Sequence, residues 1–554
     1  MAWSAGSVTR RSLLAAGAGL ATAAGVGSLA GCNGSRGQSS NNASSNTAVT
    51  LPSYIPYAGA EPDLASTEDG VEAGFYTYPA DRPVSVPDKP GTGSQKLTGM
   101  ANVYVPVPAG PDKNTWWAGL NDRLGVDMNM IMVPNADYAN KFATTIAGND
   151  LPDMMQMLVV ANFPQLLESR FTPLDEHLSG NAIKEYPNLA NVPAFTWKNA
   201  VYNGHIYGIP IPRGRVGSYD FIRPDIFADL GVSPEVTGGW DGFLETVKAL
   251  SDPKSRRWAF CISTHALSMV QRINECANGW AEEGGQLTSV YETDRYKQSV
   301  QDMVTLWQAN VLHPDSFNTQ QPFKQLFSSG NAVIDQDGYL AWAGFVSSNK
   351  ENPDFKQGTM TLTTRDGSKP APWFPGTGYY SINSITKTDD VEKVKFALRV
   401  CNYLAAPFGT QEQFYLTYGE EGVNHDLVDG EPLLNDKGIA DIALPVGYMG
   451  ASPHVLYQPG RPQDVDAQHA YMSTVLPRSV VNPTLGLFSN TSATKSAPAT
   501  LALTDAVNAI IQGRKPFTDL DGAVQTWKKA AGDAMRDEFT EQLQVQGGPS
   551  SSPS

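Results

Sequence analysis

The sequence predicts an α/β protein of two lobes. Segments with strand-like and helix-like patterns alternate between residues 101 and 160, and this alternation is typical of a three-layer sheet with right-handed crossovers. Beyond residue 95 the chain has roughly 450 residues of ordinary globular composition, which exceeds what one hydrophobic core supports. A second lobe is therefore expected.

The first lobe is predicted to begin with strand, helix, strand, helix and strand. The alternation of residue types predicts the first strand, and Tyr138, Phe142 and Ile146 recur at helical spacing in the second helix. The five elements are expected at residues 101–107, 114–124, 126–133, 137–147 and 153–160. Ligands bind beyond the carboxyl ends of the strands in such sheets. The loop 106–114 and the residues 160–163 are therefore expected at the mouth of a site.

The second lobe is predicted to follow the Pro-bracketed segment that ends at Pro212. Its strands are expected at residues 218–222, 259–262 and 332–334, and its helices at 224–230, 240–250 and 294–310. Helical patterns predominate afterwards, at residues 391–404, 501–512 and 522–543.

The first 32 residues carry the pattern of an export and anchoring signal. Arg10 and Arg11 precede a short apolar run, and Leu29-Ala30-Gly31 precede Cys32. Twin arginines before such a run indicate export, and a small-residue box ending in Cys is typical of lipoprotein processing. The run is too short and too rich in Gly for a spanning helix, which needs about 20 apolar residues. We therefore expect a signal peptide at 1–31 and a lipid on Cys32 that holds the protein at a bacterial membrane surface.

A flexible linker is expected over residues 32–95. Residues 33–50 are mostly Gly, Ser, Asn and Gln, a composition that buries too little apolar area to offset chain entropy. Residues 51–93 are rich in Pro, Gly and Asp but also contain aromatic residues, so this part is either a spacer or lies against the body. The folded body is expected from residue 96, and residues 547–554 are expected to form a disordered tail.

The composition restricts the classes of partner. The formal net charge is −16, and nucleic acid and anionic membrane surfaces both require basic patches, so neither is expected as the main partner. Beyond Cys32 the chain has Cys261, Cys276 and Cys401, without the spacing of a zinc site. Either Cys261 and Cys276 form a disulfide, or all three are buried free thiols.

No catalytic pattern stands out. The seven histidines lack metal-ligand spacing, and no Gly-x-Ser-x-Gly elbow occurs. The adjacent acids Glu420 and Glu421 make a poor carboxylate pair for glycoside hydrolysis. Asp335 and Asp337 lie in an Asp-x-Asp-Gly pattern that suggests calcium, but the full twelve-residue ligand loop is missing. We expect a protein that is not an enzyme and that has no cofactor and no metal.

Several segments resemble the extracellular solute-binding proteins of bacterial ABC importers, in the carbohydrate-type class. The resemblance runs from about residue 97 to 546, and its strength lies in the order of the motifs. The matching segments are 141–154 with Leu-Pro-Asp, 203–210 (Asn-Gly-His-Ile-Tyr-Gly-Ile-Pro), 327–334 followed by 337–342, 418–424, and 511–514 followed by 527–530. The last two are similar to a lipoprotein subgroup compared with a Gram-positive lipoprotein of complex-sugar uptake. His205 stands where the class commonly has Lys.

The resemblance implies a two-lobe fold of the periplasmic-binding-protein type II, with three-layer α/β/α lobes joined by a multi-segment hinge. The crossovers are expected at residues 209–213 and 373–379, where Pro and Gly suit a hinge. The expected parts are lobe 1 at 96–212, lobe 2 at 213–372, a return to lobe 1 at 373–410, and helical segments packing on both lobes at 411–546.

The function implied is that of a monomeric, lipid-anchored substrate-binding protein on the extracellular face of the cytoplasmic membrane of a Gram-positive bacterium. It would capture an oligosaccharide or sugar derivative by lobe closure and deliver it to the membrane permease of an ABC transporter. One alternative is an exported carbohydrate-active enzyme, since aromatic residues and acids are also typical of a glycosidase cleft. The other is a carbohydrate sensor or adhesion lipoprotein.

Candidate ligand residues follow from the chemistry of sugars, which offer apolar ring faces and a rim of hydroxyl groups. Aromatic candidates lie after a predicted strand (Tyr339 and Trp342), at the return crossover (Trp373 and Phe374), after another strand (Phe163) and on the first strand of lobe 2 (Tyr219). Polar candidates are Asp335, Asp337, Asn162, Arg213 and Arg215, of which the arginines could grip a carboxylate or sugar hydroxyls. For each aromatic residue the alternative is that its ring packs between a strand and a helix.

Overall fold

The computed structural model describes residues 41–318, 320–352 and 354–545. The predicted signal peptide, the lipidation site Cys32 and the predicted tail lie outside the described residues. Within those residues no helix has the length and apolar character needed to cross a bilayer.

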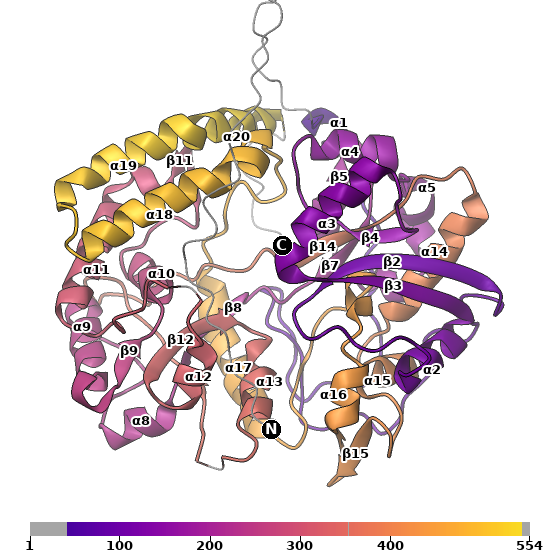
Figure 1. Cartoon of the computed structure of the whole chain (residues 1–554), viewed down its shortest axis with the longest axis horizontal. Helices are drawn as coiled ribbons and strands as arrows, with labels where there is room; N and C mark the ends of the chain where they lie inside the picture. The colour runs from indigo at the N-terminus through magenta and orange to yellow at the C-terminus, as the bar shows by residue number, and fades with distance from the viewer. Residues whose placement is uncertain (1–40, 319, 353, 546–554) are drawn as a thin grey trace, which may run out of the picture. The chain divides into compact units, whose positions relative to one another are not determined.

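The first lobe is built on a five-stranded sheet in the order β3-β2-β4-β14-β7 (Figure 1). The central strand β2 pairs in parallel with β3 and β4, whereas β14 runs antiparallel to β4 and β7. The bounds are β2 (Gln95–Val103), β3 (Val126–Pro134), β4 (Met154–Gln156), β7 (Ile209–Pro212) and β14 (Tyr379–Ile385). The predicted order of strand, helix, strand, helix and strand is confirmed, although the first strand lies further toward the N-terminus and the third is shorter.

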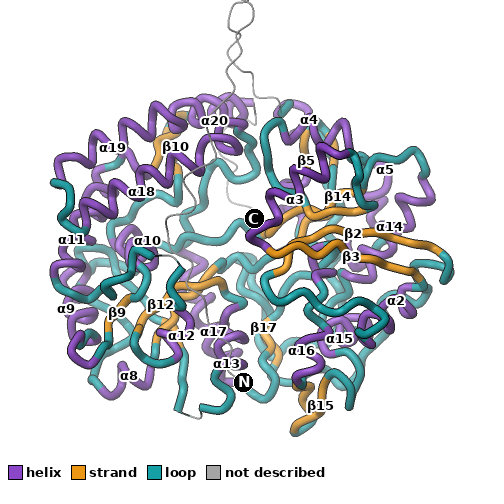
Figure 2. The backbone as a smooth tube through the Cα atoms, in the orientation of Figure 1, coloured by secondary structure: helices purple, strands orange, loops and turns teal. Residues whose placement is uncertain are grey.

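Two helices connect the parallel strands and cover opposite faces of this sheet, as Figure 2 shows. Helix α2 (Thr115–Leu124) begins where the Asn114 side chain accepts a hydrogen bond from the Trp117 N–H, and it ends at Gly125, whose φ is 64°. Helix α3 (Asn135–Gly148) buries Tyr138 and Phe142, the residues whose spacing predicted it. Local sequence thus fixes both boundaries of α2 and the buried face of α3.

The second lobe is built on a four-stranded sheet in the order β13-β8-β12-β9. Strand β12 pairs antiparallel with β8 and parallel with β9. The strands are β8 (Ser218–Ile222), β9 (Trp258–Phe260), β12 (Ala332–Gly338) and β13 (Gly358–Thr359), and the helices around them are α8 (Pro224–Asp229), α9 (Gly239–Leu250), α10 (Ser263–Ile273), α11 (Asp294–Gln308), α12 (Phe323–Ser328) and α13 (Ala341–Ser348). Helix α10 was not predicted, although it buries an amphipathic face.

Two crossovers carry the chain between the sheets, one after β7 and one before β14. The Arg213 N–H donates to the Gly378 carbonyl at 3.0 Å, and the Gly376 N–H donates to the Arg215 carbonyl at 2.8 Å. Gly217 has a φ of 71°, and a Cβ placed there would lie 2.8 Å from the backbone of Gly376. Only glycine therefore allows the two crossovers to approach each other this closely.

The remaining helices cover both lobes. The predicted helix at 522–543 is divided into α19 and α20 by a π-helical turn at 528–532, where the Trp527 ring lies against Gly532. The remaining helices are α4 (Phe163–Arg170), α5 (Asp175–Leu178), α6 (Pro187–Ala190), α7 (Ala194–Trp197), α14 (Val391–Leu404), α15 (Gln411–Tyr418), α16 (Asp436–Asp441), α17 (Pro462–Val475), α18 (Ala497–Ile511), α19 (Leu520–Trp527) and α20 (Asp533–Val545). The remaining paired strands are β5 (Val201–Tyr202) with β6 (His205–Ile206), β10 (Trp280–Glu283) with β11 (Gln286–Ser289), and β15 (His425–Val428) with β16 (Glu431–Leu434).

The segment 41–95 packs against the body, which differs from the expected flexible linker. It contains the short helix α1 (Ala43–Thr47) and the strand β1 (Gly74–Phe75), which pairs in parallel with β17 (Leu456–Tyr457). Further along, the Glu412 carboxylate accepts hydrogen bonds from the backbone N–H groups of Ser85 and Val86. Single buried side chains and backbone hydrogen bonds hold this segment, and neither produces the periodic pattern that a sequence prediction depends on.

Candidate ligand-binding site

A cavity of about 610 Å³ lies at the crossovers between the two sheets. One wall comes from the crossovers themselves, and the others come from the N-terminal segment, from helix α7 with the residues before it, and from two loops of the body. The wall residues on which the argument depends are Tyr54, Tyr57, Glu68, Glu72, Phe75, Phe195, Arg213, Gly214, Arg215, Gly378, Phe408 and His454. The packed N-terminal segment thus completes a cavity at the point where the lobes join.

Arg213 and Arg215, two of the predicted ligand residues, both line this cavity. The Arg213 guanidinium lies 4.9 Å from the centre of the Tyr380 ring and donates to the Pro212 carbonyl at 3.0 Å. The Arg215 guanidinium lies 5.7 Å from the centre of the Phe195 ring. Within the described part of the chain, neither arginine forms an ion pair with a carboxylate.

Glu72, His454 and Tyr339 form a polar cluster beside Gly214. The Glu72 carboxylate lies 2.7 Å from Nδ1 of His454, and the Tyr339 ring meets His454 edge-on with centroids 5.0 Å apart. The Tyr339 hydroxyl accepts a hydrogen bond from the Gly214 N–H at 3.1 Å. Burial raises the pKa of Tyr339 to about 12, so its hydroxyl stays protonated at neutral pH. Tyr339 therefore supports the crossover next to the cavity.

A cluster of tyrosines lies at the carboxyl ends of the strands of lobe 1. Tyr104 is 61% exposed and Tyr380 is 37% exposed, and their hydroxyl groups share a short hydrogen bond. Tyr448 stacks on Tyr380 with ring centroids 5.2 Å apart, and the Asn102 amide donates to the Tyr380 hydroxyl. This exposed aromatic surface adjoins Arg213 and was not predicted from the sequence.

Three predicted ligand residues lie in a hydrophobic core behind the sheet of lobe 2. Tyr219, Trp342 and Trp373 are all at most 2% exposed and belong to one buried cluster. The Trp342 ring meets Tyr219 with centroids 5.5 Å apart, and the Trp373 indole N–H donates to the Val216 carbonyl. Helix α13 turns back over β8, so these rings have no free face in this structure. That arrangement matches the packing alternative.

The predicted acidic residues pair with side chains of lobe 2. Asp335 is fully buried, with Oδ1 2.8 Å from Nδ1 of His265, and Asp337 forms an ion pair with Lys324 at 3.0 Å. Phe374 is half-buried against the core of lobe 2. The structure thus does not bring these three residues into the crossover cavity.

The predicted residues after β4 lie at the mouth of lobe 1. Asn162 is exposed, and its backbone N–H donates to the Asn490 side chain. Phe163 is buried and lines a smaller cavity of about 230 Å³, together with Tyr379 and Tyr380. This cavity and the tyrosine cluster share Tyr380.

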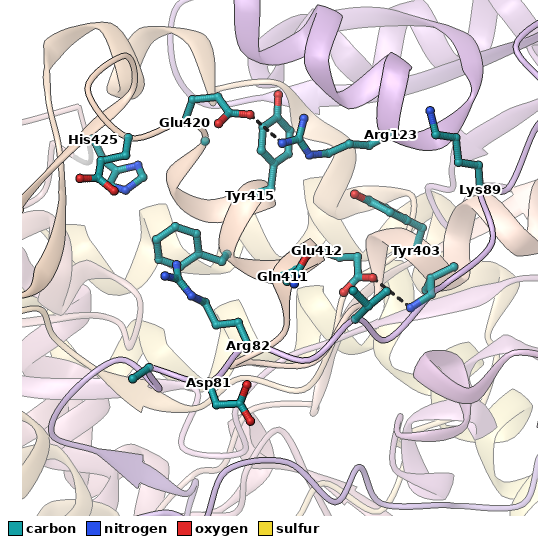
Figure 3. Close-up of a pocket in the computed structure, with 16 residues that line it drawn as sticks. Asp81, Arg82, Lys89, Arg123, Tyr403, Gln411, Glu412, Tyr415, Glu420 and His425 are labelled. Carbon is teal, nitrogen blue, oxygen red and sulfur yellow. Dashed lines mark hydrogen bonds and ion pairs between the residues drawn. The ribbon is translucent and has the colours of Figure 1, made fainter.

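Another cavity, of about 650 Å³, lies near the end of α2 and beside α15 (Figure 3). Arg82 lies over the Phe414 ring at 3.9 Å, and Arg123 forms an ion pair with Glu420 at 2.6 Å. Its walls come from lobe 1 and the N-terminal segment and include no residue of the crossovers. The crossover cavity is therefore the better candidate for a site that responds to lobe movement.

Thiol chemistry is not favoured. Cys261, Cys276 and Cys401 are free and buried. The structure therefore has three buried free thiols and not the alternative disulfide between Cys261 and Cys276. Burial raises the pKa of Cys276 to about 11 and that of Cys401 to about 12, which keeps both protonated at neutral pH. Among the described residues, no group of three or more His, Cys, Asp or Glu side chains is placed to hold a metal ion.

Two α/β lobes joined by paired crossovers, with a cavity at those crossovers, define a two-lobe binding protein of the periplasmic type. The chain belongs to the family of bacterial extracellular solute-binding proteins, whose model matches residues 118–440.

Individual relatives are similar over most of their length. The lipoprotein LipO of Bacillus subtilis is 22% identical over 456 residues, which cover 76% of this chain and 88% of the relative. The polygalacturonan/rhamnogalacturonan-binding protein YtcQ of Bacillus subtilis is 22% identical over 487 residues, which cover 82% of this chain and 93% of the relative. Among solved structures, the S. pneumoniae ABC-transporter substrate-binding protein FusA in complex with kestose is similar in fold, with a TM-score of 0.57 and 16% identity over 82% of this chain and all of that chain.

Proposed function

We propose that this protein is the substrate-binding component of a bacterial ABC importer and that it captures an oligosaccharide or sugar derivative. The observation that carries the proposal is the cavity of about 610 Å³ at the crossovers, which has aromatic rings and two arginines in its wall. Aromatic faces suit the apolar faces of sugar rings, and guanidinium groups suit hydroxyl or carboxylate oxygens. The family and the sugar-binding relatives support the same function.

Capture proceeds by closure of the two lobes. The crossovers are tied by two backbone hydrogen bonds and contain Gly214, Gly217, Gly376 and Gly378, so few side chains resist a change in their dihedral angles. A ligand that contacts the closed state more extensively shifts the balance toward that state by its differential affinity. The permease then receives the closed complex.

The lipid on Cys32 holds the protein at the extracellular face of the cytoplasmic membrane. The proposal rests on the sequence pattern Leu29-Ala30-Gly31-Cys32 after twin arginines, and the name of the relative LipO agrees with it. A tether keeps the binding protein near its permease and raises its effective concentration there.

Thermal-shift screening of the purified protein against a panel of oligosaccharides tests the proposed function. A ligand at 100 times its Kd stabilises the folded state by about 2.7 kcal/mol, which raises the melting temperature measurably. Chromatography of the same mixtures should recover each oligosaccharide unchanged. A panel without any stabilising carbohydrate, or turnover that is lost on mutation of one acid, would contradict the proposal.

A further inference from the structure

The crossover cavity contains two cations without acidic partners. Several other arginines that are partly or fully buried have carboxylates: Arg223 pairs with Asp225, Arg272 with Asp220, and Arg536 with Glu292. The partly buried Arg257, Arg399 and Arg478 instead donate to backbone carbonyls and do not line this cavity. Arg213 and Arg215 have no carboxylate partner within the described residues, although the protein as a whole is acidic. An arginine left unpaired in a cavity wall is available to an anion that enters from solvent.

Both arginines line the same cavity. Arg213 directly follows β7, and its N–H donates to the Gly378 carbonyl, which extends the pairing of β7 with β14 by one residue. Arg215 lies in the turn that the Gly217 N–H closes on the Gly214 carbonyl. The Tyr380 ring lies beside the Arg213 guanidinium and the Phe195 ring beside that of Arg215. One N–H group of Arg213 donates to the Pro212 carbonyl, and a guanidinium has five N–H donors, so others are available for ligand oxygen atoms.

The acids of the wall do not neutralise these arginines. Glu72 lies against His454 at 2.7 Å, and Glu68 is exposed at the rim. The same wall supplies Tyr54, Tyr57, Phe75 and Phe408, whose rings suit the apolar face of a sugar. The cavity therefore combines a site for a carboxylate with a surface for a pyranose ring.

We propose that the crossover cavity selects an acidic saccharide, and that the carboxylate of a uronate residue lies between Arg213 and Arg215. This inference rests on the proposed function and names the substrate class of the same site. Bidentate recognition of a carboxylate by arginine is stronger and more directional than recognition of hydroxyl groups, so removing the charge from the saccharide should remove most of the affinity.

The test compares two probes that differ only in charge: tri-galacturonate and its full methyl ester. Calorimetry on the full-length protein at low salt should give at least tenfold tighter binding of the acid. Arg213→Gln and Arg215→Gln should each weaken binding of the acid by tenfold or more. The same variants should change the affinity for the ester by less than twofold. Arg82→Gln in the other cavity is the matched control, because Arg82 also lies over an aromatic ring, and it should change neither affinity.

Each other outcome is decisive. If the acid and the ester bind equally, or neutral oligosaccharides bind more tightly, the inference fails while the proposed function stands. If no saccharide of either kind binds, the proposed function itself fails. Sodium acetate at matched ionic strength should not compete with tri-galacturonate, and competition would mean that the cavity takes small anions instead. If a Gln variant melts at a lower temperature than the unmodified protein, Arg213→Lys or Arg215→Lys replaces it. A Lys variant that still prefers the acid supports the inference, and a Lys variant that binds both probes equally overturns it.

Discussion

Replacement of Trp342 by Ala should destabilise the protein and leave ligand affinity nearly unchanged. Trp342 is 1% exposed, and its ring lies 5.5 Å from the Tyr219 ring and 5.7 Å from the Phe221 ring, both on β8. A buried aromatic side chain removes about 150–250 Å² from water, which at about 25 cal/mol/Å² gives about 4–6 kcal/mol as an upper bound. Truncations of buried aromatic residues cost about 3–5 kcal/mol, so we expect a loss in that range.

Urea unfolding followed by circular dichroism measures the loss, and calorimetry on the same samples measures affinity for the oligosaccharide found by screening. Leu340→Ala is the matched control, since Leu340 immediately precedes α13 and is 51% exposed, and it should change stability by less than about 0.5 kcal/mol. A variant with unchanged stability and tenfold weaker binding would show that Trp342 is a ligand platform. That result would refute the reasoning from burial and restore the interpretation based on sequence alone.

Three further predictions concern the tyrosine cluster, the thiols and the anchor. Tyr380→Ala should weaken oligosaccharide binding by about tenfold, equivalent to about 1.4 kcal/mol, because it removes an exposed ring that supports Arg213; calorimetry checks this, and an unchanged Kd would contradict it. The pKa of Cys276 is raised to about 11, so about one protein molecule in a thousand should carry the Cys276 thiolate at pH 8. A thiol reagent should therefore label Cys276 in guanidinium chloride but not in the folded protein. Cys32→Ala should abolish metabolic lipid labelling and release the protein from membranes, and equal anchoring of the variant would rule out the proposed lipidation.

The sequence predicted the parts of the fold that depend on local periodicity. The strands and helices from residue 95 to 156 follow patterns that repeat within a few residues, and turns such as Gly125 mark their ends. The segment 41–95 could not be predicted in this way. Its place is fixed by distant partners, such as the pairing of Gly74 with Leu456 and the contact of Ser85 with Glu412, and a single sequence carries no signal for such pairs.

The candidate site was predicted in part, for the same reason. Arg213 and Arg215 were placed at the site because they directly follow a recognisable crossover. Tyr104 and Tyr380 were missed because they are separated by 276 positions and meet only when β2 and β14 enter one sheet. Trp342 follows a core strand just as a platform residue would, and only the turn of α13 back toward β8 decides that its ring packs in the core.

The position of the two arginines also bears on how binding is coupled to closure. A ligand that contacted only one lobe would bind the open and closed states equally and could not shift the balance between them. Arg213 and Arg215 lie on the crossover itself, where Gly376 and Gly378 hydrogen-bond to them, so any change in the dihedral angles of the hinge also moves the guanidinium groups. A carboxylate held between them therefore favours one geometry of the crossover over the other. The charge of the ligand and the angle between the lobes are in this way linked through the same few residues.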